Sequence, residues 1–112
     1  MLLWNLNFQH IDNRAVVSLN LNPIYDSGLI DHDPALNINV PFIPVPGENV
    51  LRISLYNTDN ALPTENPWHL SFTLTDPGGT VVATVNAEMP ADASPVISND
   101  RVVLLTGIAF SA

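Results

Sequence analysis

The chain contains no cysteine among its 112 residues. Disulfides, zinc–thiolate centres and thiol nucleophiles are therefore excluded. Small secreted domains often depend on disulfides for stability, so their absence favours a cytoplasmic protein, or a component of a particle such as a virion, over a secreted one. The sequence indicates no compartment more narrowly than this.

Positive charge is scarce, because the chain has no lysine and its basic residues are Arg14, Arg52 and Arg101. Eleven acidic residues bring the net charge to −8. Nucleic-acid binding needs a cluster of cations that displaces counterions from the phosphates, and binding to an anionic membrane needs a similar cluster. We therefore expect neither nucleic acid nor a membrane as a partner. A basic partner or a cation is electrostatically more compatible with this chain.

Familiar catalytic motifs are also missing. The sequence has no Gly-x-Ser-x-Gly elbow and no His-Glu-x-x-His pair. The glycines of DPGGT lack the lysine of a phosphate-binding loop, and a turn explains them. The apolar start MLLWNLNF lacks the basic segment of a signal peptide, and no apolar run reaches the length of a membrane span. We expect a protein that is not an enzyme and that needs no cofactor and no metal.

Apolar residues are abundant instead. Hydrophobic residues make up 46% of the chain and charged residues 12%, with a mean hydropathy of +0.21. This length suits one domain with one core, and the apolar content exceeds what a small core needs. Some of the excess interrupts the polar positions of the pattern, at Leu3, Val16, Val82 and Val103. The composition therefore predicts self-association or a protein partner.

Apolar and polar residues alternate with a period of two through most of the chain. In WHLSFTLT, residues 68–75, every second residue is apolar and the residues between them are polar. Such alternation is typical of antiparallel sheets with one buried and one solvated face. Seven segments share it: LLWNLNF, AVVSLNL, ALNINVPF, VLRISLYN, WHLSFTLT, TVVATVNA and RVVLLTGIAF.

Proline and glycine mark the connections between these segments. All ten prolines fall at segment ends or between segments, where the missing N–H disturbs no ladder of hydrogen bonds. The stretch TDPGGT is a strong signal for a hairpin turn. We therefore predict an all-β protein, a single antiparallel β-sandwich domain spanning residues 1–112. It should have about seven strands and be immunoglobulin-like or of the jelly-roll type.

The acidic residues predict a candidate binding end. If each connection reverses the chain, loops near 9–14, 43–49 and 76–79 share one end, and those near 22–34, 57–67 and 88–100 share the other. The second set holds eight of the 11 acidic residues. Function often resides on long loops, although long polar loops also contain aspartate simply because it favours turns. The candidate residues at this end are Asp26, Asp31, His32, Asp33, Asp59 and Glu65.

Two functions are compatible with these observations. The leading hypothesis is a non-enzymatic structural or interaction subunit of a larger assembly, such as a virion decoration protein or another accessory structural protein. Its partners would be other proteins or further copies of the chain. The alternative is a ligand-binding β-sandwich that uses the acidic end. It would bind calcium, which takes about six to eight oxygen ligands, or a carbohydrate stacked on Tyr25 and Tyr56.

Overall fold

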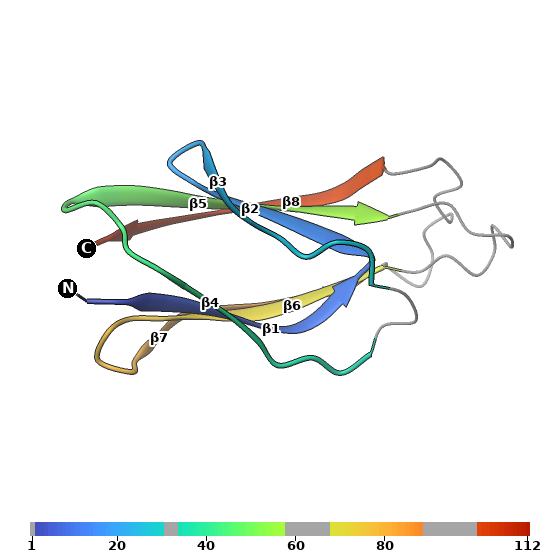
Figure 1. Cartoon of the computed structure of the whole chain (residues 1–112), viewed down its shortest axis with the longest axis horizontal. Coiled ribbons are helices and arrows are strands. Elements are labelled where there is room, and N and C mark those ends of the chain that lie inside the picture. The colour runs from blue at the N-terminus through green and yellow to red at the C-terminus, as the bar shows by residue number, and fades with distance from the viewer. Residues whose placement is uncertain (1, 31–33, 58–67, 89–100) are drawn as a thin grey trace, which may run out of the picture.

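Two antiparallel sheets of four strands each pack face to face (Figure 1). The computed structural model describes residues 2–30, 34–57, 68–88 and 101–112. Sheet I has the order β4-β1-β6-β7, formed by β4 (Ile38–Phe42), β1 (Trp4–Asp12), β6 (His69–Thr75) and β7 (Val81–Glu88). Sheet II has the order β3-β2-β5-β8, formed by β3 (Asn22–Asp26), β2 (Arg14–Leu19), β5 (Glu48–Asn57) and β8 (Arg101–Ser111). The prediction of an all-β antiparallel sandwich is confirmed.

The eighth strand is β3, which lies inside the segment 22–34 that the alternation assigned to a loop. Strand β3 pairs with β2 alone, so it is an edge strand of sheet II. It contains Pro23, which an edge tolerates because the missing N–H leaves no interior ladder bond unmade. Its sequence NPIYD has no clean alternation, and this is why the sequence pattern did not reveal it.

This extra strand changes which loops share an end. The chain turns at Asn20 and Leu21, runs back along β3, and reaches the opposite end of the sandwich before β4 begins (Figure 1). The β1–β2 junction lies at that same opposite end, where Asp12 pairs in register with His69 at the start of β6. The prediction that loop 9–14 shares an end with loops 43–49 and 76–79 was therefore wrong.

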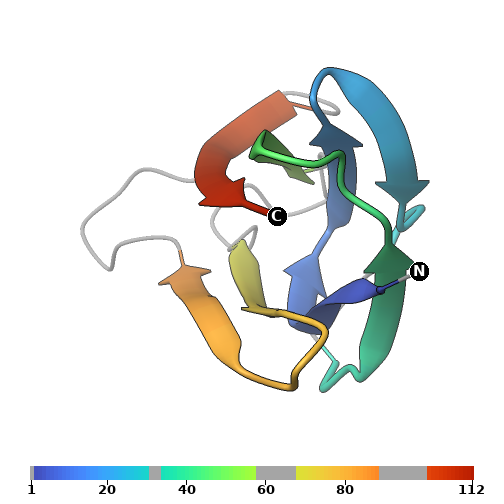
Figure 2. The ribbon, with the colours of Figure 1, turned by 90° about the vertical axis from the view of Figure 1, so that its left-hand side faces the viewer.

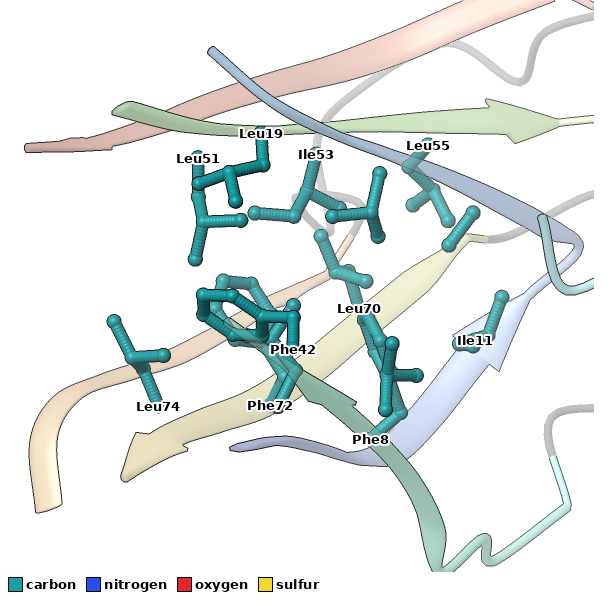
Figure 3. Packing of buried hydrophobic residues seen from close by; sticks show 14 of the residues in the cluster. Phe8, Ile11, Leu19, Phe42, Leu51, Ile53, Leu55, Leu70, Phe72 and Leu74 are labelled. Carbon is teal, nitrogen blue, oxygen red and sulfur yellow. The ribbon is translucent and has the colours of Figure 1, made fainter. Parts of the chain in front are cut away.

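The alternation decides which side chains enter the core. Along β1, Trp4, Leu6 and Phe8 point between the sheets and are buried, while Asn5 and Asn7 point outward. The other inner strands follow the same rule (Figure 3). The buried apolar set is Trp4, Leu6, Phe8, Ile11, Ala15, Val17, Leu19, Val40, Phe42, Leu51, Ile53, Leu55, Leu70, Phe72 and Leu74.

Aromatic rings contact one another within and between the two layers. The rings of Phe8 and Phe72 lie on neighbouring strands of sheet I with centroids 5.6 Å apart. Phe110 of sheet II reaches across to Trp4 at 4.6 Å and to Phe42 at 6.2 Å. Tilted and edge-on pairs of this kind add about 0.5–1.5 kcal/mol each beyond the area that they bury. The last residues of β8 are therefore packed onto sheet I.

The packing predicts that Phe72 is a major source of stability. Phe72 is fully buried, so Phe72→Ala should lower the free energy of unfolding by about 3–5 kcal/mol through lost burial and a cavity. Thr73→Ala, which changes the next residue on the outer face, should change it by less than about 0.5 kcal/mol. Urea denaturation of the two variants measures both values. Equal effects would mean that the inward and outward positions of β6 are assigned wrongly.

Candidate functional site

The acidic end contains one described residue of the predicted set. Asp26 is the last residue of β3, whereas Asp31, His32, Asp33, Asp59 and Glu65 lie outside the described residues. The Asp26 carboxylate accepts hydrogen bonds from Arg14 Nε at 3.0 Å and from Arg14 Nη2 at 2.7 Å. This bidentate ion pair neutralises Asp26 from within the chain.

The ion pair also lowers the pKa of Asp26. The hydrogen bond from Arg14 is the main cause, and a second one from the Gly28 N–H at 2.9 Å assists it, so that the pKa of Asp26 falls to about 2. The Arg14 guanidinium also lies 5.1 Å from the centre of the Tyr56 ring. Asp26, Arg14 and Tyr56 thus form one connected group at this end of sheet II.

Tyr25, the other tyrosine of the carbohydrate hypothesis, has an internal role. Its ring stacks on Phe8 with centroids 5.9 Å apart. Burial raises the pKa of the Tyr25 hydroxyl, and the neighbouring Asp26 charge raises it further. Both tyrosines of the hypothesis therefore make aromatic or cation contacts within the chain.

Two histidines meet beside the β1–β2 junction. The rings of His10 and His69 stack with centroids 4.2 Å apart, and His69 Nε2 lies 2.9 Å from Asn86 Oδ1. The pairing of β1 with β6 joins these two residues, which are far apart in the sequence. The described part of the chain contains no group of three or more His, Cys, Asp or Glu residues that could hold a metal ion.

The outer face of sheet I is covered with amide groups that bond to one another. Asn5 Nδ2 donates to Asn39 Oδ1 at 3.0 Å, and Asn7 Nδ2 donates to Asn37 Oδ1 at 2.6 Å and to Asn39 Oδ1 at 3.0 Å. Gln9 Nε2 donates to Asn7 Oδ1 at 2.6 Å. This ladder of amides makes the outer face of sheet I polar and neutral across β1 and β4.

The outer face of sheet II has a different chemistry. Four large aliphatic side chains are exposed on it or at its turn: Leu21 by 75%, Val50 by 41%, Val102 by 46% and Leu105 by 63%. They come from the β2–β3 turn, from β5 and from β8, and Val50 has the small Ala109 opposite it in register. We call these four residues, together with Arg52 and Ala109, the aliphatic face.

Arg52 lies in the middle of the aliphatic face. Its neighbours in register are Ser18 on β2 and Gly107 on β8, so small residues flank it on both sides. Within the described ranges Arg52 has no ion pair and no hydrogen-bonded partner, in contrast to Arg14. A hollow of about 290 Å³ beside it is lined by Asn20, Leu21, Val50 and Arg52.

The edges of the two sheets are protected unequally. Strands β3 and β4 form the edges on one flank, and each contains a proline, at Pro23 and Pro41. Strands β7 and β8 form the edges on the other flank and contain none (Figure 2). Strand β8 is 11 residues long and has no acidic residue. Because proline and charge are the usual means of blocking an edge strand and the charge of β8 is confined to its first residue, Arg101, β8 presents an unblocked edge from Val102 onward, next to the aliphatic face.

The sequence singled out other apolar residues than those of the aliphatic face. Of the four interrupting residues that it singled out, Leu3 and Val82 are exposed and Val16 is half-buried, while the side chain of Val103 lies outside the described set. It missed Leu105, because the run VVLL gives no alternation from which a direction can be read. A bulge between Leu55 and Tyr56 resolves that direction in the structure.

Comparisons with known proteins add no assignment. No family model, no curated protein and no solved structure matches the chain. Across the residues that the structure describes, no helix is long and apolar enough to cross a bilayer.

The Arg14–Asp26 ion pair predicts a specific dependence of stability on pH. The pKa of Asp26 is about 2 in the folded chain and about 3.9 in an unfolded one, so the pair stabilises the fold above about pH 4. A double-mutant cycle with Asp26→Asn and Arg14→Gln should give a coupling energy of about 0.2–1 kcal/mol at neutral pH, as expected for an exposed pair. This coupling should fade as the pH falls from about 4 to about 2. A coupling that persists undiminished at the lower pH would rule out an ionic origin.

Proposed function

We propose that the chain is a non-enzymatic structural or interaction subunit that binds protein through the aliphatic face within a larger assembly. One example of such a subunit is a virion decoration protein or another accessory structural protein. The observation that supports this proposal is the contrast between the two outer faces. Across β1 and β4, sheet I presents bonded amides to water, whereas sheet II presents Leu21, Val50, Val102 and Leu105.

The energetics favour covering such a face. Removing apolar surface from water gains about 25 cal/mol per Å², and full burial of a leucine side chain gains about 1.5–3 kcal/mol. Contiguous apolar patches on soluble proteins commonly mark interaction sites. Interface cores are also depleted in charge and enriched in arginine, which agrees with one central arginine among aliphatic residues. Exposed Leu21 and Leu105 are therefore the strongest candidates for contact residues.

The unblocked edge of β8 supports the same proposal by a second route. An edge strand offers a row of unpaired N–H and C=O groups that another extended chain can complete. Because β8 also contributes Val102 and Leu105 to the aliphatic face, one partner can contact the face and the edge together. The non-enzymatic part of the proposal depends on the sequence, which lacks the catalytic motifs named above.

Fractionation of an extract of the source cells tests this proposal. In a density gradient the chain should sediment well ahead of a free 12.2 kDa protein. Leu105→Lys should move it to lighter fractions, because burial of an ammonium group in an interface is costly. Thr84→Lys, which introduces the same charge at an exposed position of β7, is the matched control and should leave the sedimentation unchanged.

Two results would contradict the proposal. The wild-type chain could sediment as a free monomer in the native extract, which would leave the aliphatic face without a partner. Alternatively, Leu105→Lys and Thr84→Lys could behave alike, which would assign the contact to some other surface. Thermal melts of both variants establish that each is folded before the comparison is made.

A further inference from the structure

We propose that a second copy of this chain occupies the part of the aliphatic face around Leu21, Val50 and Arg52, placed so that Arg52 of each copy pairs with Glu48 of the partner subunit. This inference rests on the proposed function, because it uses part of the same face and names the partner. The observation behind it is the order of outward-facing residues on β5. An acid, an aliphatic residue and a base follow one another as Glu48, Val50 and Arg52.

The spacing of these three residues is symmetric. Successive outward residues of a strand are about 6.6 Å apart, so Glu48 and Arg52 lie at equal distances on either side of Val50. Consider a two-fold axis that lies in the plane of the interface, perpendicular to β5 and level with Val50. This axis places β5 antiparallel to β5 of the partner subunit. That rotation brings Arg52 opposite the partner's Glu48 and brings Glu48 opposite the partner's Arg52. One contact pattern therefore occurs twice, as an isologous interface requires.

Both charged groups are available for this pairing. Glu48 is exposed, and its carboxylate accepts one side-chain hydrogen bond, from Ser111 Oγ to Oε1 at 2.8 Å. A carboxylate has about four acceptor positions, so Glu48 retains the capacity to accept from a guanidinium. Arg52 has no partner within the described ranges. Each group would thus gain a partner without losing the one that it has.

The surface around Arg52 permits close approach of another sheet. Gly107 lies beside it in register, and a Cβ added at Gly107 would meet nothing within 4 Å. Ser18 on the other side is small. Stacked sheets keep their strand directions within about 30° of each other and lie about 10 Å apart. A long side chain such as Arg52 can span this distance.

Leu21 supplies a second, independent contact. It lies in the two-residue β2–β3 turn with a φ of 71°, a left-handed conformation that favours glycine or asparagine. A leucine is costly there, and at 75% exposure its side chain adds little to the core. The proposed axis places the β2–β3 turns of the two copies opposite each other. Leu21 of one copy then faces the hollow of about 290 Å³ beside Leu21 and Val50 of the other.

The local charge of this face is compatible with a second copy. Two molecules of net charge −8 repel each other, and the repulsion is smallest where their local charge is zero. The charged side chains described on the outer face of sheet II are the Arg14–Asp26 pair, Arg52 and Glu48, and these sum to zero.

Charge reversal with mixing tests the arrangement on the purified 112-residue chain, with mass measured by sedimentation velocity. The wild type should be a dimer. Arg52→Glu sets two carboxylates against each other at both contacts, and Glu48→Arg sets two guanidinium groups against each other. Each change should weaken dimerisation by about tenfold or more, because like charges at an interface are strongly unfavourable. Glu88→Arg makes the same charge change as Glu48→Arg, but at the end of β7. It is the matched control and should leave the dimer intact.

An equal mixture of Arg52→Glu and Glu48→Arg should dimerise almost as tightly as the wild type. In the mixed dimer one contact joins the two changed side chains, now of opposite charge, and the other contact joins the two original ones. Rescue by mixing cannot come from a misfolded variant, so it also controls for folding. It would support both the occupant and the pairing of Arg52 with Glu48.

Three results would overturn the inference. The wild type could be a monomer at every concentration. Both reversal variants could dimerise like the wild type, as expected for pairing through the β8 edge. The mixture could fail to restore the dimer. In each case the proposed function still stands if the chain sediments in heavy fractions of the native extract, because the partner would then be a different protein or the contact a different one.

Discussion

The face-to-face packing of two alternating sheets is the constraint on which the rest of this structure depends. This packing places every second side chain of the central strands in one apolar layer, which includes Phe8 and Phe72 of sheet I and Ile53 of sheet II. The period of two leaves no freedom in this assignment, because a shift by one residue would turn a whole row of apolar side chains outward. The remaining residues, those on the two outer faces, determine how the molecule meets its surroundings.

The two outer faces have the same strand geometry but carry different side chains. On sheet I, Asn5 and Asn7 bond to the amides of Asn37 and Asn39, so the part of this face across β1 and β4 offers water a neutral polar surface. On sheet II, aliphatic side chains surround an arginine. The two arginines described there have different surroundings, since Arg14 is held by Asp26 at 2.7 Å whereas Arg52 lies between a serine and a glycine. This difference directs the functional argument to the second face.

The sequence predicts the inner positions well and the pairing of strands poorly. Alternation in residues 68–75 identified Phe72 as a core residue because burial has a local signature of period two. Strand β3 was not predicted, because Pro23 and the short, uneven pattern of this segment resemble a loop. The predicted arrangement of loops at the two ends was wrong for the same reason. The ion pair of Asp26 with Arg14 and the position of Gly107 beside Arg52 depend on strand register, which no single segment of sequence encodes.

The most direct test of the account is to identify which residues change environment when the purified chain associates with itself. Amide and methyl signals in nuclear magnetic resonance spectra, recorded over a dilution series, report this residue by residue. We predict that the signals that shift on dilution belong to Val50, Arg52 and Leu21 and to their neighbours on β2, β5 and β8. Shifts confined to the amide-covered strands β1, β4 and β6, or no shift at any concentration, would contradict self-association through the aliphatic face.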